Sequence, residues 1–120
     1  MILVDTSVWV DHLRAGDEHL IELLNSSQVL AHPFVIGELA CGNLRNRDDI
    51  LRLLNDLPLA PVASQEEVLH FIKSNKLMGL GIGFIDAHLL ASTALADTTF
   101  LWTRDKRLQN IARKLKLAVG

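Results

Sequence analysis

Cysteine is almost absent from this sequence, which has a single one, Cys41, among 120 residues. One cysteine excludes an internal disulfide and any zinc site built from several cysteines. The chain is therefore not a secreted, disulfide-stabilised scaffold, and a reducing cytoplasm is the compartment that we expect.

Long apolar runs are also missing. No run approaches the roughly 20 residues that a membrane-spanning helix needs. The opening residues, Met1 to Asp5, lack the basic start of a signal peptide and reach a carboxylate after three apolar residues. We therefore expect neither a signal peptide nor a membrane span.

An excess of one charge is lacking too, because 12 Lys and Arg face 14 Asp and Glu, for a formal net charge of −2. This balance argues against non-specific coating of nucleic acid. Six of the twelve basic residues, however, lie between Arg104 and Lys116. Such a basic end can attract a polyanion, although a solvated helix face would have the same composition.

Aromatic residues are few: there is no tyrosine, and two Trp and four Phe lie mostly within apolar runs. We expect most of them in the core, which disfavours a passive single-strand binding module that stacks bases on exposed rings. The chain is nevertheless rich in core formers, with 49% apolar and 22% charged residues. This composition indicates a folded chain, and its length fits a single domain over residues 1–120.

Short apolar stretches alternate with longer helical patterns along the chain. We expect strands at 2–4, 28–31, 59–62, 98–103 and 117–119, and helices at 6–13, from 17, 33–41, from 48, 64–78, 84–95 and 104–116. This alternation predicts an α/β fold with a short parallel sheet of about four to five strands, covered by helices on both faces. Functional residues in such sheets lie beyond the carboxyl ends of the strands.

Two acidic residues fall at those positions. Asp5 directly follows the first strand, and Asp105 follows the strand that ends at Thr103. Each could instead be the N-cap of the next helix, so neither is specific alone.

Two further acidic residues interrupt apolar helices. Glu38 lies in the segment 34–41, and Asp86 lies in the segment 82–90. We expect both to be buried, and a buried carboxylate needs a compensating partner. A nearby Arg or Lys is one possibility, and a cation shared by all four carboxylates is the other. Oxygen ligands suit Mg²⁺ or Mn²⁺, which can support phosphodiester hydrolysis.

Four segments carrying these acids resemble the motifs of PIN-domain endoribonucleases, and closely those of the VapC toxins of type II toxin–antitoxin systems. They are Ile-Leu-Val-Asp5-Thr-Ser, Val-Ile-Gly-Glu38-Leu-Ala, Gly-Phe-Ile-Asp86-Ala-His and Leu-Trp-Thr-Arg-Asp105. Each motif is short, but the four occur in the family's order across the whole chain. The resemblance implies a PIN-like three-layer α/β/α fold.

The same resemblance implies an RNA-cleaving enzyme dependent on Mg²⁺ or Mn²⁺, with Asp5, Glu38, Asp86 and Asp105 as catalytic and metal-binding residues. Supporting or substrate contacts would come from residues beside these acids: Thr6, Ser7, Thr103, Arg104 and Arg107. Many members have another acid where this chain has Arg107, which puts a second metal in doubt and offers a contact to an RNA phosphate. The family's partners imply a VapB-type antitoxin and a homodimer.

Three other functions fit parts of the pattern. A phospho-acceptor receiver domain has a similar layout, but it needs an acidic pair after the first strand and an acceptor Asp after the third, and both are missing. A PIN-like module that only binds a partner would have lost at least one acid, and this chain keeps four. A PIN nuclease acting in RNA processing or on DNA would have the same pocket.

Overall fold

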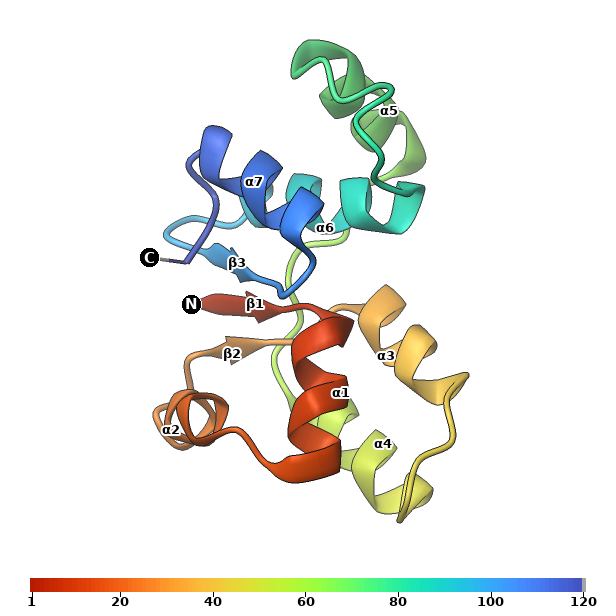
Figure 1. Ribbon diagram of the computed structural model, residues 1–120, viewed down its shortest axis with the longest axis vertical. Coiled ribbons are helices and arrows are strands. Elements are labelled where there is room, and N and C mark those ends of the chain that lie inside the picture. Colours follow the sequence, from red (N-terminus) through yellow and green to blue (C-terminus); the bar gives the residue numbers. More distant parts are fainter. Residues whose placement is uncertain (120) are drawn as a thin grey trace.

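Three short parallel strands form the sheet, with β1 (Ile2–Val4) between β2 (Val29–Leu30) and β3 (Phe100–Trp102). The computed structural model describes residues 1–119 and pairs Leu3 with both Leu30 and Leu101. Because all strands run in one direction, their carboxyl ends lie at one edge of the sheet. Figure 1 shows this edge on the side away from the two chain termini.

Seven helices surround the sheet within residues 1–119: α1 (Thr6–Ala15), α2 (Glu18–Asn25), α3 (Pro33–Ala40), α4 (Arg47–Asp56), α5 (Gln65–Ser74), α6 (Phe84–Leu95) and α7 (Lys106–Lys114). The helices α1, α3 and α7 each follow a strand, so each begins near the carboxyl edge. The fold is the PIN-like α/β/α arrangement that the sequence predicts.

Local signals fix several helix starts. The Asp17 carboxylate accepts a hydrogen bond from the backbone N–H of Leu20, 2.9 Å away, and so caps α2. Ser64 and Glu67 exchange the two hydrogen bonds of a capping box at the start of α5. These starts agree with prediction. The end of α5 does not, because the chain leaves the helix at Ser74 and Lys76 takes a left-handed conformation.

The sheet has fewer full strands than expected. Residues 59–62 contribute one bridge, between Ala31 and Leu59, and residues 117–119 contribute one, between Leu101 and Ala118. Pro58 and Pro61 explain the first case, since proline has no N–H for a ladder. The predicted outer strands are thus present as single bridges at the two edges of a three-stranded sheet.

Apolar side chains from the sheet and the surrounding helices form the main core: Leu3, Val4, Val8, Leu20, Val29, Leu89, Leu90, Leu101 and Leu108. The prediction that most aromatic side chains lie in the core holds only in part: Trp9 belongs to the core, and Phe71 and Trp102 pack against it while partly buried. Trp9 is buried, whereas Phe84 and Phe100 are 45% and 42% exposed. These two phenylalanines lie in apolar stretches of the sequence, but their side chains are exposed to solvent. None of the helices in residues 1–119 is long and apolar enough to cross a membrane.

Candidate active site

Asp5 lies at the carboxyl end of β1 and is only 6% exposed. Two hydroxyls donate to its Oδ2 atom: Ser7 Oγ at 2.8 Å and Thr103 Oγ1 at 2.7 Å. Although Asp5 occupies the N-cap position of α1, its side chain accepts no capping hydrogen bond. The helix-cap alternative therefore does not account for this carboxylate.

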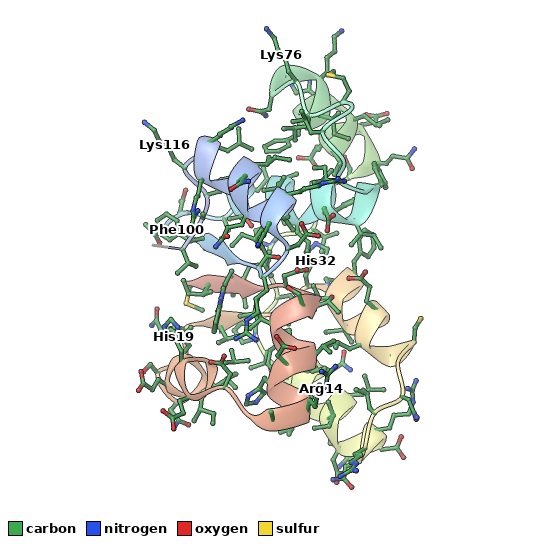
Figure 2. All side chains as sticks on the ribbon, viewed as in Figure 1. Arg14, His19, His32, Lys76, Phe100 and Lys116 are labelled. Atoms are coloured by element: carbon green, nitrogen blue, oxygen red, sulfur yellow. The ribbon has the colours of Figure 1, made fainter. Side chains whose placement is uncertain are left out.

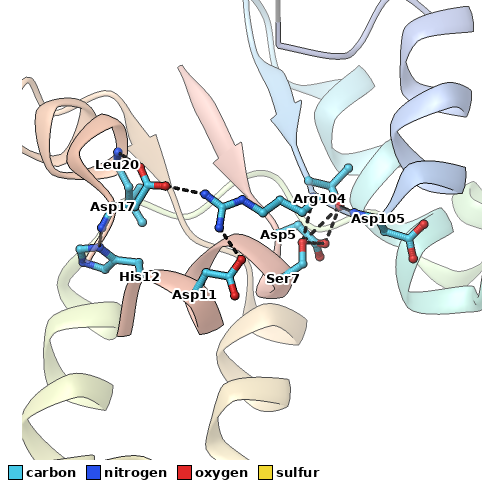
Figure 3. A network of polar contacts seen from close by, with 9 residues as sticks. Asp5, Ser7, Asp11, His12, Asp17, Leu20, Arg104 and Asp105 are labelled. Atoms are coloured by element: carbon cyan, nitrogen blue, oxygen red, sulfur yellow. Dashed lines mark hydrogen bonds and ion pairs between the residues drawn. The ribbon is translucent and has the colours of Figure 1, made fainter. Parts of the chain in front are cut away.

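Backbone N–H groups orient both hydroxyls. The Arg104 N–H donates to Ser7 Oγ at 3.0 Å, and the Asp105 N–H donates to Thr103 Oγ1 at 3.1 Å. Each hydroxyl thus accepts one hydrogen bond from the backbone after β3 and donates one to Asp5. Figure 3 shows this network from Asp5 and Ser7 to Arg104 and Asp105. It fixes the rotamer of Asp5 and joins the ends of β1 and β3.

Glu38 reaches the same edge of the sheet from α3. Its Oε1 atom accepts a hydrogen bond of 2.7 Å from Thr6 Oγ1, at the first residue of α1. The prediction that Glu38 is buried is wrong, since this residue is exposed. The short α3 helix buries Val35 and Leu39 and presents Gly37 and Glu38 to solvent. An apolar helix segment can therefore still have an open face where a site lies.

Asp86 is the third residue of α6 and is partly buried. Burial raises the pKa of this carboxyl, while a 3.3 Å hydrogen bond from the Gly83 N–H lowers it. The negative charges of Asp5, Asp105 and Glu38 raise its pKa further. Asp86 therefore lies within the electrostatic field of the other three carboxylates, as one acidic cluster requires.

Only one of the two carboxylate oxygens of Asp105 is used within the fold. One carboxylate oxygen, Oδ1, caps α7 by accepting from the Leu108 N–H at 3.1 Å. The helix-cap alternative thus holds for Oδ1 of Asp105, and Oδ2 has no hydrogen-bond donor among residues 1–119. No described Arg or Lys forms an ion pair with any of the four acids. The alternative of internal charge compensation at Glu38 and Asp86 is therefore wrong.

Arg104 and Arg107 lie in different surroundings. The Arg104 guanidinium binds Asp11 and Asp17, as Figure 3 shows, so its side chain turns away from the acidic cluster. Only its backbone N–H enters the network around Asp5. The exposed Arg107 side chain instead crosses Gly81, in the loop before α6: a Cβ atom built on Gly81 would lie 2.6 Å from Arg107 Nη1.

The donor set of the acidic cluster fits a divalent cation. It consists of carboxylate and hydroxyl oxygens, which Mg²⁺ and Mn²⁺ prefer. Within residues 1–119, no three His, Cys, Asp or Glu side chains are gathered closely enough to enclose an ion together. Mg²⁺ keeps several waters and takes only one or two protein carboxylates, so the wider spacing suits a hydrated ion. Mutual repulsion of the uncompensated acids favours this spacing.

A groove of about 610 Å³ adjoins this cluster, and sequence reasoning missed it. Its lining comes from α1, from the end of α3 and from the loop before α4, and it includes Glu38, Arg14 and Arg45. These segments are distant in sequence, so no local motif reveals the groove.

The chain belongs to the PIN domain family, whose pattern it matches over residues 2–114. It is 51% identical over 109 residues to Ribonuclease VapC32 from two Mycobacterium tuberculosis strains, CDC 1551 / Oshkosh and ATCC 25618 / H37Rv. The alignment covers 91% of this chain and 88% of each relative. These likenesses confirm the resemblance to VapC-type PIN proteins that the four acidic motifs indicate.

Proposed function

We propose that this protein is an endoribonuclease toxin that hydrolyses RNA phosphodiester bonds with Mg²⁺ or Mn²⁺. The observation that carries this proposal is the cluster of four acids without an internal counter-charge, with burial and the other three carboxylates raising the pKa of Asp86. Such a cluster needs a cation when its members are ionised. The likeness to a protein named a ribonuclease favours RNA as the substrate.

In this proposal Asp5, Glu38, Asp86 and Asp105 would hold the hydrated ion, one or two of them directly and the others through its bound waters. A bound divalent cation would lower the pKa of water and offset the charge that develops on the leaving oxygen. Ser7 and Thr103 keep Asp5 in one rotamer through hydrogen bonds to Oδ2. Thr6 does the same for Glu38. Orienting hydrogen bonds of this kind tune metal affinity and activity.

Arg107 would contact the RNA backbone. Its side chain lies over Gly81, has no ion-pair partner among residues 1–119 and borders the segment that leads to Asp86. A guanidinium matches the geometry of phosphate oxygens. Arg104 would act differently, through its N–H on Ser7, because Asp11 and Asp17 neutralise its side chain.

The proposal includes a VapB-type antitoxin that blocks the acidic cluster, a homodimer and action in the cytoplasm. Several large apolar side chains near the start of α6 are exposed, including Met78, Leu80, Phe84 and Ile85. Exposed apolar patches commonly mark protein contacts. This surface supports association with a protein, and the antitoxin and the second copy are the two partners proposed.

RNA cleavage by the purified chain, freed of any antitoxin, tests the function. Total cellular RNA is incubated with Mg²⁺ or Mn²⁺, with EDTA, and with the Asp86→Asn variant. We expect discrete fragments that require the metal and Asp86, and sequencing their ends would identify the cut. A Glu22→Gln variant, which neutralises an exposed acid on α2, serves as the matched control and should cleave normally.

Absence of cleavage by a folded, metal-loaded chain would contradict the enzyme and favour the PIN-like module that only binds a partner. Cleavage of DNA in place of RNA, or trimming of one structured RNA precursor, would favour a PIN nuclease without a toxin role.

A further inference from the structure

The groove beside Glu38 has the chemistry of a nucleotide site. Apolar side chains of Val10, Leu13, Leu39 and Ile50 line part of it. Polar and cationic groups line the rest: Arg14, Asn43, Arg45 and Asn46. Its volume of about 610 Å³ lies within the range of about 300–1,000 Å³ of small-ligand sites.

The cationic groups in this groove are available to a ligand. Arg14 and Arg45 are exposed, and neither forms an ion pair or a hydrogen bond with another part of residues 1–119. The side chains of Asn43 and Asn46 likewise have no hydrogen-bond partner in this range. Two unpaired guanidinium groups in a partly apolar groove suit a ligand with both phosphate charges and flat apolar faces.

The loop that forms one wall is held in place. Arg47 donates a hydrogen bond of 2.6 Å to the Ala40 carbonyl oxygen, so it ties the start of α4 to the end of α3 across the loop. Asn46, the N-cap residue of α4, takes a left-handed conformation with φ of 51°. One hydrogen bond from a side chain to the backbone thus ties this loop to α3, whereas Arg45, next to Arg47, stays free.

The groove is continuous with the acidic cluster because Glu38 belongs to both. This residue lines the groove and accepts the hydrogen bond from Thr6 near Asp5. A strand of RNA whose phosphate lies at the four acids would therefore have its neighbouring nucleotide at the groove. Arg14 and Arg45 would meet the adjacent phosphates.

We propose that this groove binds an unpaired nucleotide segment next to the bond that is cut, with Arg14 and Arg45 on its phosphates and Asn43 and Asn46 on its base. This inference rests on the proposed RNA cleavage and adds the subsite that selects the RNA. Arg14 and Arg45 act in substrate binding, away from the reacting phosphate.

Binding is measured by fluorescence anisotropy with a labelled 12-nucleotide RNA of randomised sequence. The host is the full chain carrying Asp86→Asn, so that the probe stays intact. In this host two double variants are compared. The groove pair carries Arg14→Gln and Arg45→Gln, and the lysine pair carries Lys73→Gln and Lys76→Gln. Both pairs remove two exposed positive charges, and Figure 2 shows Lys76 at the top of the molecule, far from Arg14 in its lower half.

We expect the groove pair to weaken binding roughly twentyfold at 0.1 M salt, and to lower the slope of log K against log salt by about 1.4, or 0.7 for each lost phosphate contact. The lysine pair should change neither value. In the cleaving chain, the groove pair should raise KM with little change in kcat, and Asn43→Ala should broaden the nucleotide preference next to the cut. Melting curves confirm that each variant is folded.

Equal effects of the two charge pairs, or none from the groove pair, would overturn the subsite while leaving cleavage by the native chain intact. Unchanged RNA binding with weakened binding of a protein inhibitor would assign the groove to that partner and also overturn it. If the native chain cuts no RNA at all, the proposed function itself fails, which is a separate observation.

Discussion

Thr103 Oγ1 donates a hydrogen bond of 2.7 Å to Asp5 Oδ2 and so joins the ends of β3 and β1, 98 residues apart in sequence. The same hydroxyl accepts from the Asp105 N–H. One buried side chain thus orients the carboxylate after β1 and the backbone that leads to the acid after β3.

Thr103→Val removes this hydroxyl and keeps the shape of the side chain. We expect a loss of about 10- to 100-fold in metal affinity or cleavage rate, as when other metal-orienting residues are changed. Titration of Mn²⁺ against cleavage rate measures the effect. Thr103→Ser keeps the hydroxyl and should retain most of the activity; a loss as large as that of the valine variant would contradict the orienting role.

Asp86→Asn should raise thermal stability in EDTA. The pKa of Asp86 is raised by burial and by the charges of Asp5, Asp105 and Glu38, so its ionised form is disfavoured in the folded state near pH 7. Removing that charge therefore stabilises the metal-free protein, provided that asparagine keeps the contact with the Gly83 N–H. Melting temperatures of the native chain, Asp86→Asn and the control Glu22→Gln test this.

Metal should reverse the order of thermal stability, so that the native chain melts at a higher temperature than Asp86→Asn. Binding to the folded state stabilises it by about 2.7 kcal/mol when the ion is present at 100 times its Kd. Mn²⁺ should therefore raise the melting temperature of the native chain and of Glu22→Gln, but much less that of Asp86→Asn. A native chain whose melting temperature does not change at millimolar Mn²⁺ would contradict a metal site at the four acids.

Gly81 and Arg107 are predicted to be coupled in stability. Gly81 has φ of +84°, and an added Cβ would lie 2.6 Å from Arg107 Nη1; Gly79 has φ of +72° with no atom within 4 Å of an added Cβ. Both alanine substitutions strain the backbone by about 1–3 kcal/mol. Gly81→Ala should be slightly the more destabilising, because the added Cβ also displaces the Arg107 side chain, which is exposed and can move at small cost.

A double-mutant cycle measures this coupling by chemical unfolding. In an Arg107→Ala background, Gly81→Ala should destabilise no more than Gly79→Ala does. Equal effects of Gly81→Ala with and without Arg107 would show that the arginine does not rest on this glycine.

Local signals were sufficient for most of the fold. Strand 2–4, helix 84–95 and the capping box at Ser64 were predictable because each depends on neighbours in sequence. The strands expected at 59–62 and 117–119 reduce to single bridges, since pairing at a sheet edge depends on partners far along the chain and on prolines that break the ladder.

The candidate site was predictable as a set of acids but not in its surroundings. The position after a strand was enough to single out Asp5 and Asp105. The exposure of Glu38 was not predictable, because the orientation of α3 decides it. The pairing of Arg104 with Asp11 and Asp17 joins residues at least 87 positions apart, and no motif signals it.

His32 should make the stability of the fold depend on pH. It is fully buried; its Nδ1 atom accepts from the Phe34 N–H at 3.1 Å, so Nε2 carries the proton at 3.0 Å from Ser92 Oγ. Burial, with a smaller contribution from the charge of His88, lowers the pKa of His32 from 6.5 to about 4. Below pH 6.5 the unfolded chain therefore binds a proton at His32, which the folded chain binds only near pH 4.

The stabilisation that neutral His32 provides is accordingly complete above pH 6.5 and is lost as the pH falls toward 4, by at most about 1.4 kcal/mol per pH unit. Unfolding free energies of the native chain and of His32→Gln, measured by denaturant from pH 4.5 to 7.5, test this. The variant should be less stable at neutral pH and less dependent on pH below 6.5. His70→Gln, at an exposed histidine on α5, should follow the native curve. Parallel curves for the native chain and His32→Gln would mean that another group governs the acid sensitivity.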